Sequence, residues 1–160
     1  MVRPVPVTLI AATAGDLEAV MAVMGAAFDP RFGEAWTRAQ LASLFVIPGT
    51  RVGMAWHADR VAGFYAARRA GPESELMLLA VDPAVRRAGI GRRLLGDWRL
   101  WGQGCGVIDY FLEMRADNPA RHLYERGGFV ECGRRREYYV GLDGIKRDAI
   151  TMRSSDDNSR

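Results

Sequence analysis

Two glycines set among arginines, Gly89 and Gly91, are the residues whose types and spacing point most directly to chemistry. Glycine has no side chain to keep a bulky anion away from the backbone amides. Arginine guanidiniums bind phosphate through paired hydrogen bonds. Four of them bracket the turn, namely Arg86, Arg87, Arg92 and Arg93. A helix that begins near Gly89 would add free backbone N–H groups and the positive end of its dipole, so the segment predicts a site for a phosphate-bearing ligand.

The run before this turn, residues 76–83, has the apolar pattern of a buried strand. Anionic ligands in α/β folds bind where such a strand passes into a helix. Two familiar phosphate motifs are excluded by the residues present. A P-loop needs Gly-Lys-Ser/Thr, but Arg93 stands two positions after Gly91, and a dinucleotide fingerprint needs a third small residue where Leu94 stands.

Further motifs lie downstream of the turn. They are Phe111-Leu-Glu-Met-Arg-Ala-Asp-Asn118, Leu123-Tyr-Glu-Arg-Gly-Gly-Phe129, Arg135-Arg-Glu-Tyr-Tyr139, Asp143-Gly144 and Asp148-Ala-Ile-Thr-Met152. Arg86, Gly89 and Gly91 meet the pattern Gln/Arg-x-x-Gly-x-Gly/Ala. In these motifs and their order, residues 76–152 resemble the GNAT acetyltransferase superfamily, and within it the ribosomal-protein-alanine N-acetyltransferase branch. The residues before position 76 agree with the family in pattern only.

The resemblance implies that acetyl-CoA is the cosubstrate. No metal is expected, because the residues show no metal-ligand spacing. The backbone of Leu79, Ala80 and Val81 would pair with the pantetheine arm like an added strand, and an N–H group there would polarise the thioester carbonyl. The other cosubstrate contacts that the resemblance implies are Arg86, Arg87, Ala88, Gly89, Ile90, Gly91, Arg92 and Asn118.

The resemblance also implies two catalytic residues. Glu113 would remove the proton of the acceptor amine, directly or through a water, and Tyr124 would protonate the departing coenzyme A thiolate. From the residues alone, two structural alternatives stay open. Glu113 could form a salt bridge with Arg115 on the same side of a strand, and Tyr124 could be a core residue.

One feature departs from the family pattern, because one residue fewer than is common separates Glu113 from Tyr124. A one-residue deletion within a helix rotates all later residues of that helix by about 100°. We expect the shift to be absorbed before the helix, with Asp117 rather than Asn118 as N-cap and Pro119 near the first turn. Whether Asn118 or Asp117 takes the family's asparagine position stays open.

The acceptor implied by the resemblance is the N-terminal alanine of a ribosomal protein. An α-amine with a pKa of about 7.7–8.0 is partly neutral at pH 7, whereas a lysine with a pKa of about 10.4 is nearly all protonated. One carboxylate is therefore a sufficient base for an N-terminus. Acetylation of a small amine and a non-catalytic acyl-CoA-binding or ribosome-associated module remain as alternatives. Selectivity is expected in the loop of residues 29–36 and near Tyr138.

Hydrophobic periodicity predicts the elements that position these residues. Strands are expected at 7–11, 51–57, 60–68, 76–83 and 107–114, with two more after 126, and helices at 16–28, 37–46, 89–103 and 119–126. This order predicts an α+β (mixed α/β) fold, which the resemblance makes GNAT-like, with a central, mostly antiparallel twisted sheet flanked by helices. We expect a single acetyltransferase domain over residues 1–153 and a disordered tail over 154–160.

Length and composition fit one domain, since 160 residues with a hydrophobic fraction of 49% can fill a single core. A net charge of +3 is too small to indicate a nucleic-acid partner. Cys105 and Cys132 show neither a disulfide framework nor metal-ligand spacing, which favours a reduced, cytoplasmic setting. Apolar runs are too short for a membrane span, and Pro6 and Thr8 interrupt the only stretch that resembles an export signal.

Overall fold

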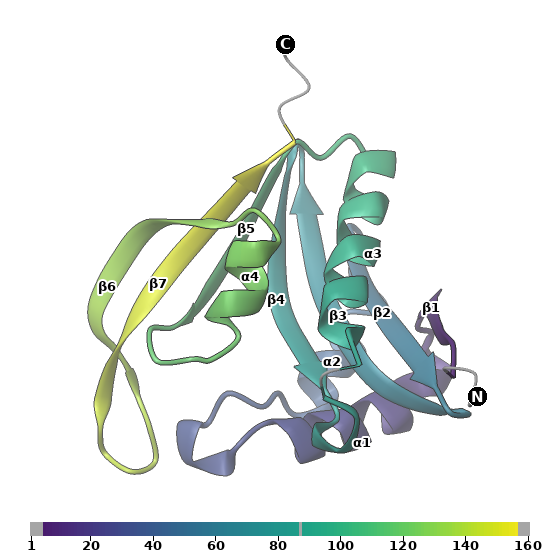
Figure 1. Cartoon of the computed structure of the whole chain (residues 1–160), viewed down its shortest axis with the longest axis horizontal. Helices are drawn as coiled ribbons and strands as arrows, with labels where there is room; N and C mark the ends of the chain where they lie inside the picture. The colour runs from purple at the N-terminus through teal and green to yellow at the C-terminus, as the bar shows by residue number, and fades with distance from the viewer. Residues whose placement is uncertain (1–4, 87, 157–160) are drawn as a thin grey trace.

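Seven strands form one sheet in the order β1-β2-β3-β4-β5-β7-β6. The computed structural model describes residues 5–86 and 88–156. The strands are β1 (Val7–Ala11), β2 (Thr50–His57), β3 (Arg60–Ala70), β4 (Glu73–Val81), β5 (Asp109–Arg115), β6 (Val130–Val140) and β7 (Lys146–Ser155). Neighbouring strands are antiparallel except β4 and β5, which are parallel (Figure 1). The expected mostly antiparallel sheet is confirmed.

Helices cover both faces of this sheet. They are α1 (Leu17–Ala27), α2 (Arg38–Ser43), α3 (Ile90–Gly104) and α4 (Arg121–Arg126), with short 3-10 turns at Ala14–Asp16, Pro30–Phe32 and Pro83–Val85. In Figure 1, α3 and α4 lie on the near face of the sheet, and α1 and α2 lie on the far face. Each face buries its own apolar cluster, one around Trp98 of α3 and Phe129, and one around Met24 of α1 and Phe64 of β3.

A β-bulge with one extra residue interrupts the alternation of side chains along β4. Consecutive Ala66 and Ala67 on β3 lie opposite Leu78 and Leu76, so the pairing skips Met77. Met77 and Leu78 consequently both face the α1 side, whereas Leu76 faces the α3 side. A bulge of this kind bends its strand and increases the local twist. It lies where β4 turns away from β5.

Two helices are shorter than the sequence predicts. The helix expected at 37–46 begins as predicted, since Thr37 and Gln40 form a capping box, but α2 ends at Ser43. The Thr50 hydroxyl lies within hydrogen-bond distance of the carbonyls of Leu44 and Ile47, so its one proton is shared between backbone groups beyond that end. The helix expected at 119–126 begins only at Arg121.

The expected disordered tail is wrong for its first residues. Strand β7 continues through Ser155, which pairs with Asp109 of β5. Arg99 of α3 also donates hydrogen bonds to the Ser154 hydroxyl and to the Asp156 carboxylate, at 2.5 and 2.9 Å. Residues 157–160 lie outside the described part, and the single-domain organisation stays a prediction. No helix in the described ranges is both long and apolar enough to cross a membrane.

Candidate active site

Strands β4 and β5 pair only over their first residues, from Glu73 opposite Asp109 to Leu76 opposite Leu112. Beyond these pairs the two strands diverge toward the bottom of Figure 1, and α4 lies in front of the opening. On its β5 side, the second half of β4 meets no strand among the described residues. Backbone N–H and C=O groups on that edge are available to a ligand that adds like a strand.

A pocket of about 230 Å³ opens at this divergence. It is lined by Phe28, Glu34, Trp36, Leu76, Met77, Leu78, Leu79, Leu112, Glu113, Met114, Asn118, Tyr124 and Tyr139. The fold therefore brings together four residues that the sequence singled out from three different segments, namely Leu79, Glu113, Asn118 and Tyr124.

Glu113 enters the pocket from β5. Its neighbours Leu112 and Met114 are buried in the core beneath α3, so alternation along the strand turns Glu113 to the other side. The Glu113 side chain is 26% exposed, and its nearest cation is Arg135, with Nε 3.8 Å from the carboxylate. Arg115, the salt-bridge partner considered from the sequence, instead pairs with Glu34 of the loop between α1 and α2 and with Asp117, two residues further along the chain.

Tyr124 reaches the same pocket from α4. Its ring is buried and packs edge-on against Phe129, with ring centroids 6.2 Å apart. Burial raises the pKa of the Tyr124 phenol above its ordinary value, so the hydroxyl stays protonated at neutral pH. This hydroxyl has no hydrogen bond to any other described residue and lies at a pocket wall, where it can donate to a ligand.

The β5–α4 turn differs from the expectation. The Asn118 side chain, not that of Asp117, accepts a hydrogen bond from a backbone N–H at the start of α4, that of Ala120 at 2.9 Å. Asp117 instead accepts hydrogen bonds from Arg115 at 2.5 Å and Arg147 at 3.1 Å. The predicted Asp117 N-cap is therefore wrong, because two guanidiniums hold that carboxylate away from the helix.

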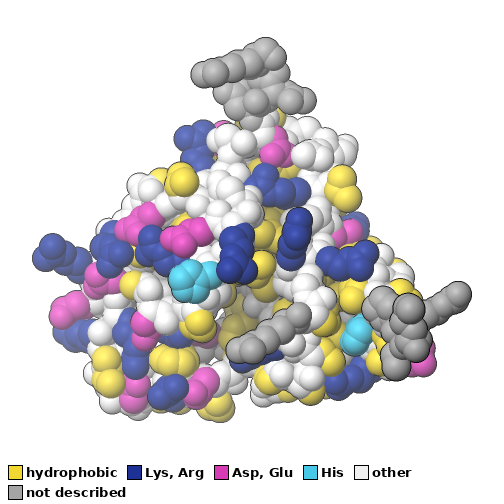
Figure 2. All heavy atoms as spheres, viewed as in Figure 1, with side chains coloured by type: hydrophobic (Ala, Val, Ile, Leu, Met, Phe, Trp, Pro, Cys, Tyr) yellow, Lys and Arg dark blue, Asp and Glu magenta, His cyan; other side chains and the backbone are white. Residues whose placement is uncertain are grey.

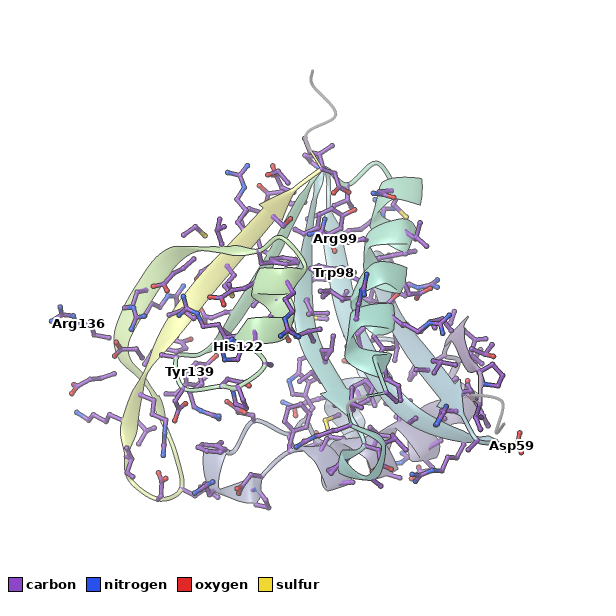
Figure 3. All side chains as sticks on the ribbon, in the orientation of Figure 1. Asp59, Trp98, Arg99, His122, Arg136 and Tyr139 are labelled. Atoms are coloured by element: carbon purple, nitrogen blue, oxygen red, sulfur yellow. The ribbon has the colours of Figure 1, made fainter. Side chains whose placement is uncertain are left out.

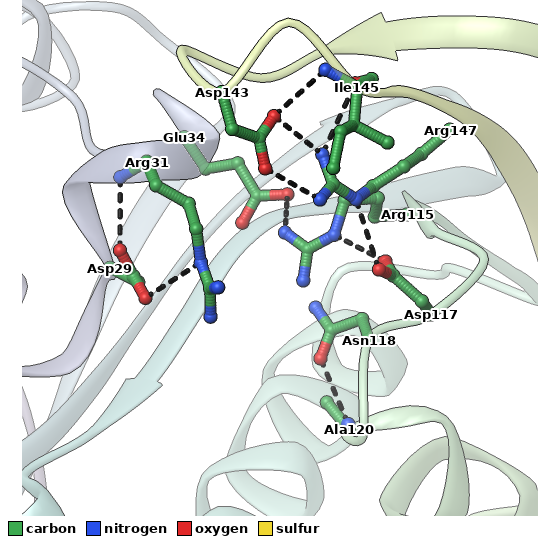
Figure 4. A network of polar contacts seen from close by, with 10 residues as sticks. All are labelled: Asp29, Arg31, Glu34, Arg115, Asp117, Asn118, Ala120, Asp143, Ile145 and Arg147. Carbon is green, nitrogen blue, oxygen red and sulfur yellow. Dashed lines mark hydrogen bonds and ion pairs between the residues drawn. The ribbon is translucent and has the colours of Figure 1, made fainter.

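A network of ion pairs ties the loops around the pocket to each other (Figure 4). Arg115, at the end of β5, donates to Glu34 of the α1–α2 loop at 2.8 Å and lies 3.4 Å from the centroid of the Phe32 ring. Arg147 of β7 donates to Asp143 of the β6–β7 loop at 2.8 Å. Asp117 accepts from both arginines, so the α1–α2 loop, which lines the pocket, is linked through the β5–α4 turn to the β6–β7 loop.

Some of the residues expected to govern selectivity line the pocket, and their effect on selectivity stays a prediction. From the 29–36 loop, Glu34 and Trp36 line the pocket. From the paired tyrosines of β6, however, Tyr139 lines it, while Tyr138 is 51% exposed. Figure 3 shows Tyr139 between β7 and the loop before α4, whereas Arg136 points out from the sheet. Burial, followed by the charges of Glu113 and Glu34, raises the pKa of Tyr139 to about 12.

A second cavity, of about 890 Å³, lies between α3 and α4. It is lined by Val81, Arg86, Gly89, Ile90, Gly91, Arg92, Leu95, Gly96, Arg99, Leu123, Arg126 and Gly127. Gly89 caps α3 with φ 72°, a left-handed conformation that favours glycine. The first hydrogen bond of the helix runs from Arg93 N–H to the Gly89 carbonyl, so the three N–H groups before it have no partner in the helix.

Positive charge gathers at this second cavity. Figure 2 shows Lys and Arg side chains over the surface between α3 and α4. Arg99 and Arg126 were not singled out from the sequence, because their approach to the Gly89 turn depends on how α4 packs against α3. Arg99 is held by Asp156 and by the Gly127 carbonyl. Arg126 has no ion pair with another described residue, and its place in the last turn of α4 was the one available signal.

Two of the predicted cosubstrate residues, Ala80 and Ala88, line neither cavity. Ala80 is buried in the core on the α1 side of the sheet. Ala88 is exposed and lines neither cavity. Arg87 lies outside the described residues. Their contacts to a cosubstrate stay predictions, as do those of the residues that line the two cavities.

Comparisons with known proteins agree with this geometry. Relatives called [Ribosomal protein bS18]-alanine N-acetyltransferase include one from Haemophilus influenzae, 33% identical over 59% of this chain and 64% of its own length. One from Escherichia coli K12 is 44% identical over 50% of this chain and 54% of its own length. The chain thus spans about half to two thirds of the curated relatives it matches.

Solved structures match over nearly the whole chain. The Escherichia coli ribosomal-protein-S18-alanine N-acetyltransferase is 29% identical, with a TM-score of 0.83 over 97% of this chain and 99% of that one. The PaiA N-acetyltransferase of Thermoplasma acidophilum, solved with coenzyme A, is 15% identical, with a TM-score of 0.76 over 94% and 99%, and shows the shared fold. The family described as Acetyltransferase (GNAT) domain matches residues 31–131. This chain, with its diverging β4 and β5 and its glycine turn before α3, belongs to that family.

Proposed function

We propose that this protein transfers the acetyl group of acetyl-CoA to the α-amine of a protein N-terminus, and that the acceptor is the N-terminal alanine of ribosomal protein bS18. The names of the relatives support the acceptor, and the family supports the cosubstrate. Because ribosomal proteins are the substrate, the proposal places the reaction in the cytoplasm. It needs no metal.

The observation that best supports this function is the open edge of β4, which connects the two cavities. Val81 lines the basic cavity at the start of α3, and Leu79, two residues earlier on the same side of the strand, lines the pocket with Glu113 and Tyr124. A pantetheine arm paired with this edge would reach from a pyrophosphate at Gly89 to a thioester in the pocket.

The chemistry then requires three groups of this chain. The amine nitrogen attacks the thioester carbonyl, and Glu113 removes the proton of the amine, directly or through a water. A backbone N–H of β4 stabilises the oxyanion that forms on the carbonyl oxygen. Tyr124 gives a hydrogen bond, and finally its proton, to the leaving thiolate. Since burial raises the pKa of Tyr124, full proton transfer comes late.

The test is incubation with acetyl-CoA and a panel of acceptors, namely peptides that begin with Ala, Ser or Met, peptides with an internal lysine, and small amines. Thiol release gives the rate, and mass spectrometry identifies the product. Turnover on an Ala-starting peptide is expected. Turnover on small amines alone would replace the proposed acceptor, and tight binding of acetyl-CoA without any product would overturn the enzymatic proposal.

A further inference from the structure

Glu34 is the second carboxylate of the acceptor pocket, and the proposed chemistry does not use it. It stands on the loop between α1 and α2, lines the same pocket as Glu113, and its side chain is 21% exposed. One oxygen, Oε1, accepts a hydrogen bond from Arg115 at 2.8 Å. The other oxygen accepts none from the described residues, so Glu34 retains acceptor capacity in the pocket.

The ion-pair network around Glu34 contains more carboxylates than guanidiniums. Three carboxylates, Glu34, Asp117 and Asp143, share the guanidiniums of Arg115 and Arg147 (Figure 4). Asp117 accepts hydrogen bonds from both arginines, and Asp143 accepts hydrogen bonds from two nitrogens of Arg147. The connected chain therefore carries one net negative charge, and the carboxylate at its pocket end is Glu34.

The electrostatics of the pocket agree with this imbalance. Burial raises the pKa of Glu34, and the opposing effect of Arg115 does not cancel it. Tyr139, across the pocket, has its pKa raised by burial and then by Glu113 and Glu34, so both carboxylates act on one hydroxyl. A cation in the pocket would offset the energetic cost of burying the Glu34 carboxylate and would donate a hydrogen bond to its second oxygen.

We propose that Glu34 binds the acceptor's protonated amine and so selects acceptors as cations, before Glu113 removes the proton. The inference rests on the proposed function, because it requires an amine acceptor. At pH 7 an α-amine with a pKa of about 7.7–8.0 is mostly ammonium, which is the form a carboxylate attracts. Glu34 then determines specificity, and Glu113 remains the base.

The test compares the wild-type protein with Glu34→Gln, which keeps the shape and the bond to Arg115 but removes the charge. The control is Glu75→Gln, which removes an exposed carboxylate that pairs with Arg68 at 2.7 Å, outside the pocket. Circular dichroism checks the fold. At pH 6.5, Glu34→Gln should raise the KM of the best Ala-starting peptide about tenfold, with kcat and the Kd of acetyl-CoA within about twofold of wild type. Glu75→Gln should change none of these values.

Two further measurements separate recognition of charge from a structural role. The Kd of the acetylated peptide, which has no ammonium, should be the same in both proteins. The KM difference should shrink as pH rises past the pKa of the amine, because the neutral amine needs no counter-charge. Groups that titrate or carry charge around Glu34 are the same in both proteins, namely Arg31, Glu113, Arg115, Asp117, Tyr139, Asp143 and Arg147.

A second variant, Glu34→Asp, keeps the charge and should bind the amine peptide more tightly than Glu34→Gln does. An equal KM increase at all pH values, or equal weakening of the acetylated peptide, would show that Glu34 only shapes the loop and would overturn the inference. Turnover with an unchanged KM in Glu34→Gln overturns it while leaving the proposed function intact. If the wild-type protein binds acetyl-CoA but neither binds nor acetylates any amine, the proposed function fails, and the inference fails with it.

Discussion

Glu113 and Tyr124 face one pocket from a strand and a helix that meet only because β4 and β5 diverge. Their environments differ as their proposed roles require. The Glu113 carboxylate is partly exposed, and the Arg135 guanidinium lies 3.8 Å from it, beyond hydrogen-bond distance, so the carboxylate is available to accept a hydrogen bond from the acceptor amine. The Tyr124 ring is buried, and its raised pKa keeps the phenol neutral so that it can donate.

Replacement of Glu113 by Gln should lower kcat about 100-fold at pH 6.5. The loss should shrink as pH rises past about 8, because the acceptor amine is then already neutral. Steady-state kinetics from pH 6 to 9 measure this. Asp109→Asn, on the same strand but outside the pocket, is the control and should keep wild-type kcat. Full activity of Glu113→Gln over the whole range would remove Glu113 from the mechanism.

Replacement of Tyr124 by Phe should lower kcat about 100-fold and change the free energy of unfolding by less than about 0.5 kcal/mol. The hydroxyl has no hydrogen bond within the described residues, and the ring contact with Phe129 is retained. Tyr110→Phe is the contrasting control. Its hydroxyl donates to the Arg99 carbonyl at 3.1 Å, so this variant should lose about 1 kcal/mol of stability and keep kcat. The opposite pattern would make Tyr124 a structural residue.

At the scale of elements, the turn between β4 and α3 was predictable from its residues. Gly89, Gly91 and the arginines around them indicate a short turn before a helix, and α3 begins at Ile90, one residue after the predicted start. The bulge at Met77 was not predictable. Residues 76–80 are all apolar and both faces of β4 are buried, so either direction of each side chain fits the same residue types.

Replacement of Gly89 by Ala should weaken acetyl-CoA binding about tenfold and cost about 1 kcal/mol of stability. An added Cβ would meet no atom within 4 Å, so the cost comes from the backbone conformation, with φ of +72°. Isothermal titration and urea unfolding measure the two effects. Gly25→Ala in α1, where the Cβ also meets nothing but φ is ordinary, should leave the Kd unchanged and raise stability. An unchanged Kd in Gly89→Ala would contradict a role for this turn in binding.

The β6–β7 loop should loosen from its contact with Arg147 in acid. Hydrogen bonds from Arg147 and from the Ile145 N–H lower the pKa of Asp143 to about 2. The unfolded chain takes up this proton near pH 4, so the stabilising effect is present above pH 4 and is lost as pH falls toward 2. Between these pH values the thermal midpoint should fall less in Asp143→Asn than in wild type.

The control for this prediction is Asp59→Asn. Asp59 lies in the tight turn between β2 and β3, at the edge of the molecule in Figure 3, and forms no ion pair with the described residues. The Asp59→Asn variant should show the same fall of the thermal midpoint between pH 4 and pH 2 as the wild type. Identical slopes for all three proteins would show that the bonds to Asp143 contribute nothing to stability.

At the scale of the whole molecule, the site depends on contacts between distant parts of the chain. The order of elements was accessible from periodicity, and the proposed catalytic pair, Glu113 and Tyr124, was accessible from family motifs. The partner of Arg115 was not, because Glu34 lies 81 positions earlier and only the closing of the α1–α2 loop onto β5 brings the two together. Asp117 was misplaced for the same reason, since Arg147 reaches it from β7.

The central claim is that the acceptor is a protein α-amine, and one competition experiment tests it most directly. A single peptide that begins with Ala and carries an internal lysine offers both amines at equal concentration. After partial turnover with acetyl-CoA at pH 7, tandem mass spectrometry locates the acetyl group. The acetyl group is expected on the alanine nitrogen, with none on the lysine. Acetylation of the lysine, or of neither amine while acetyl-CoA is bound, would contradict the account.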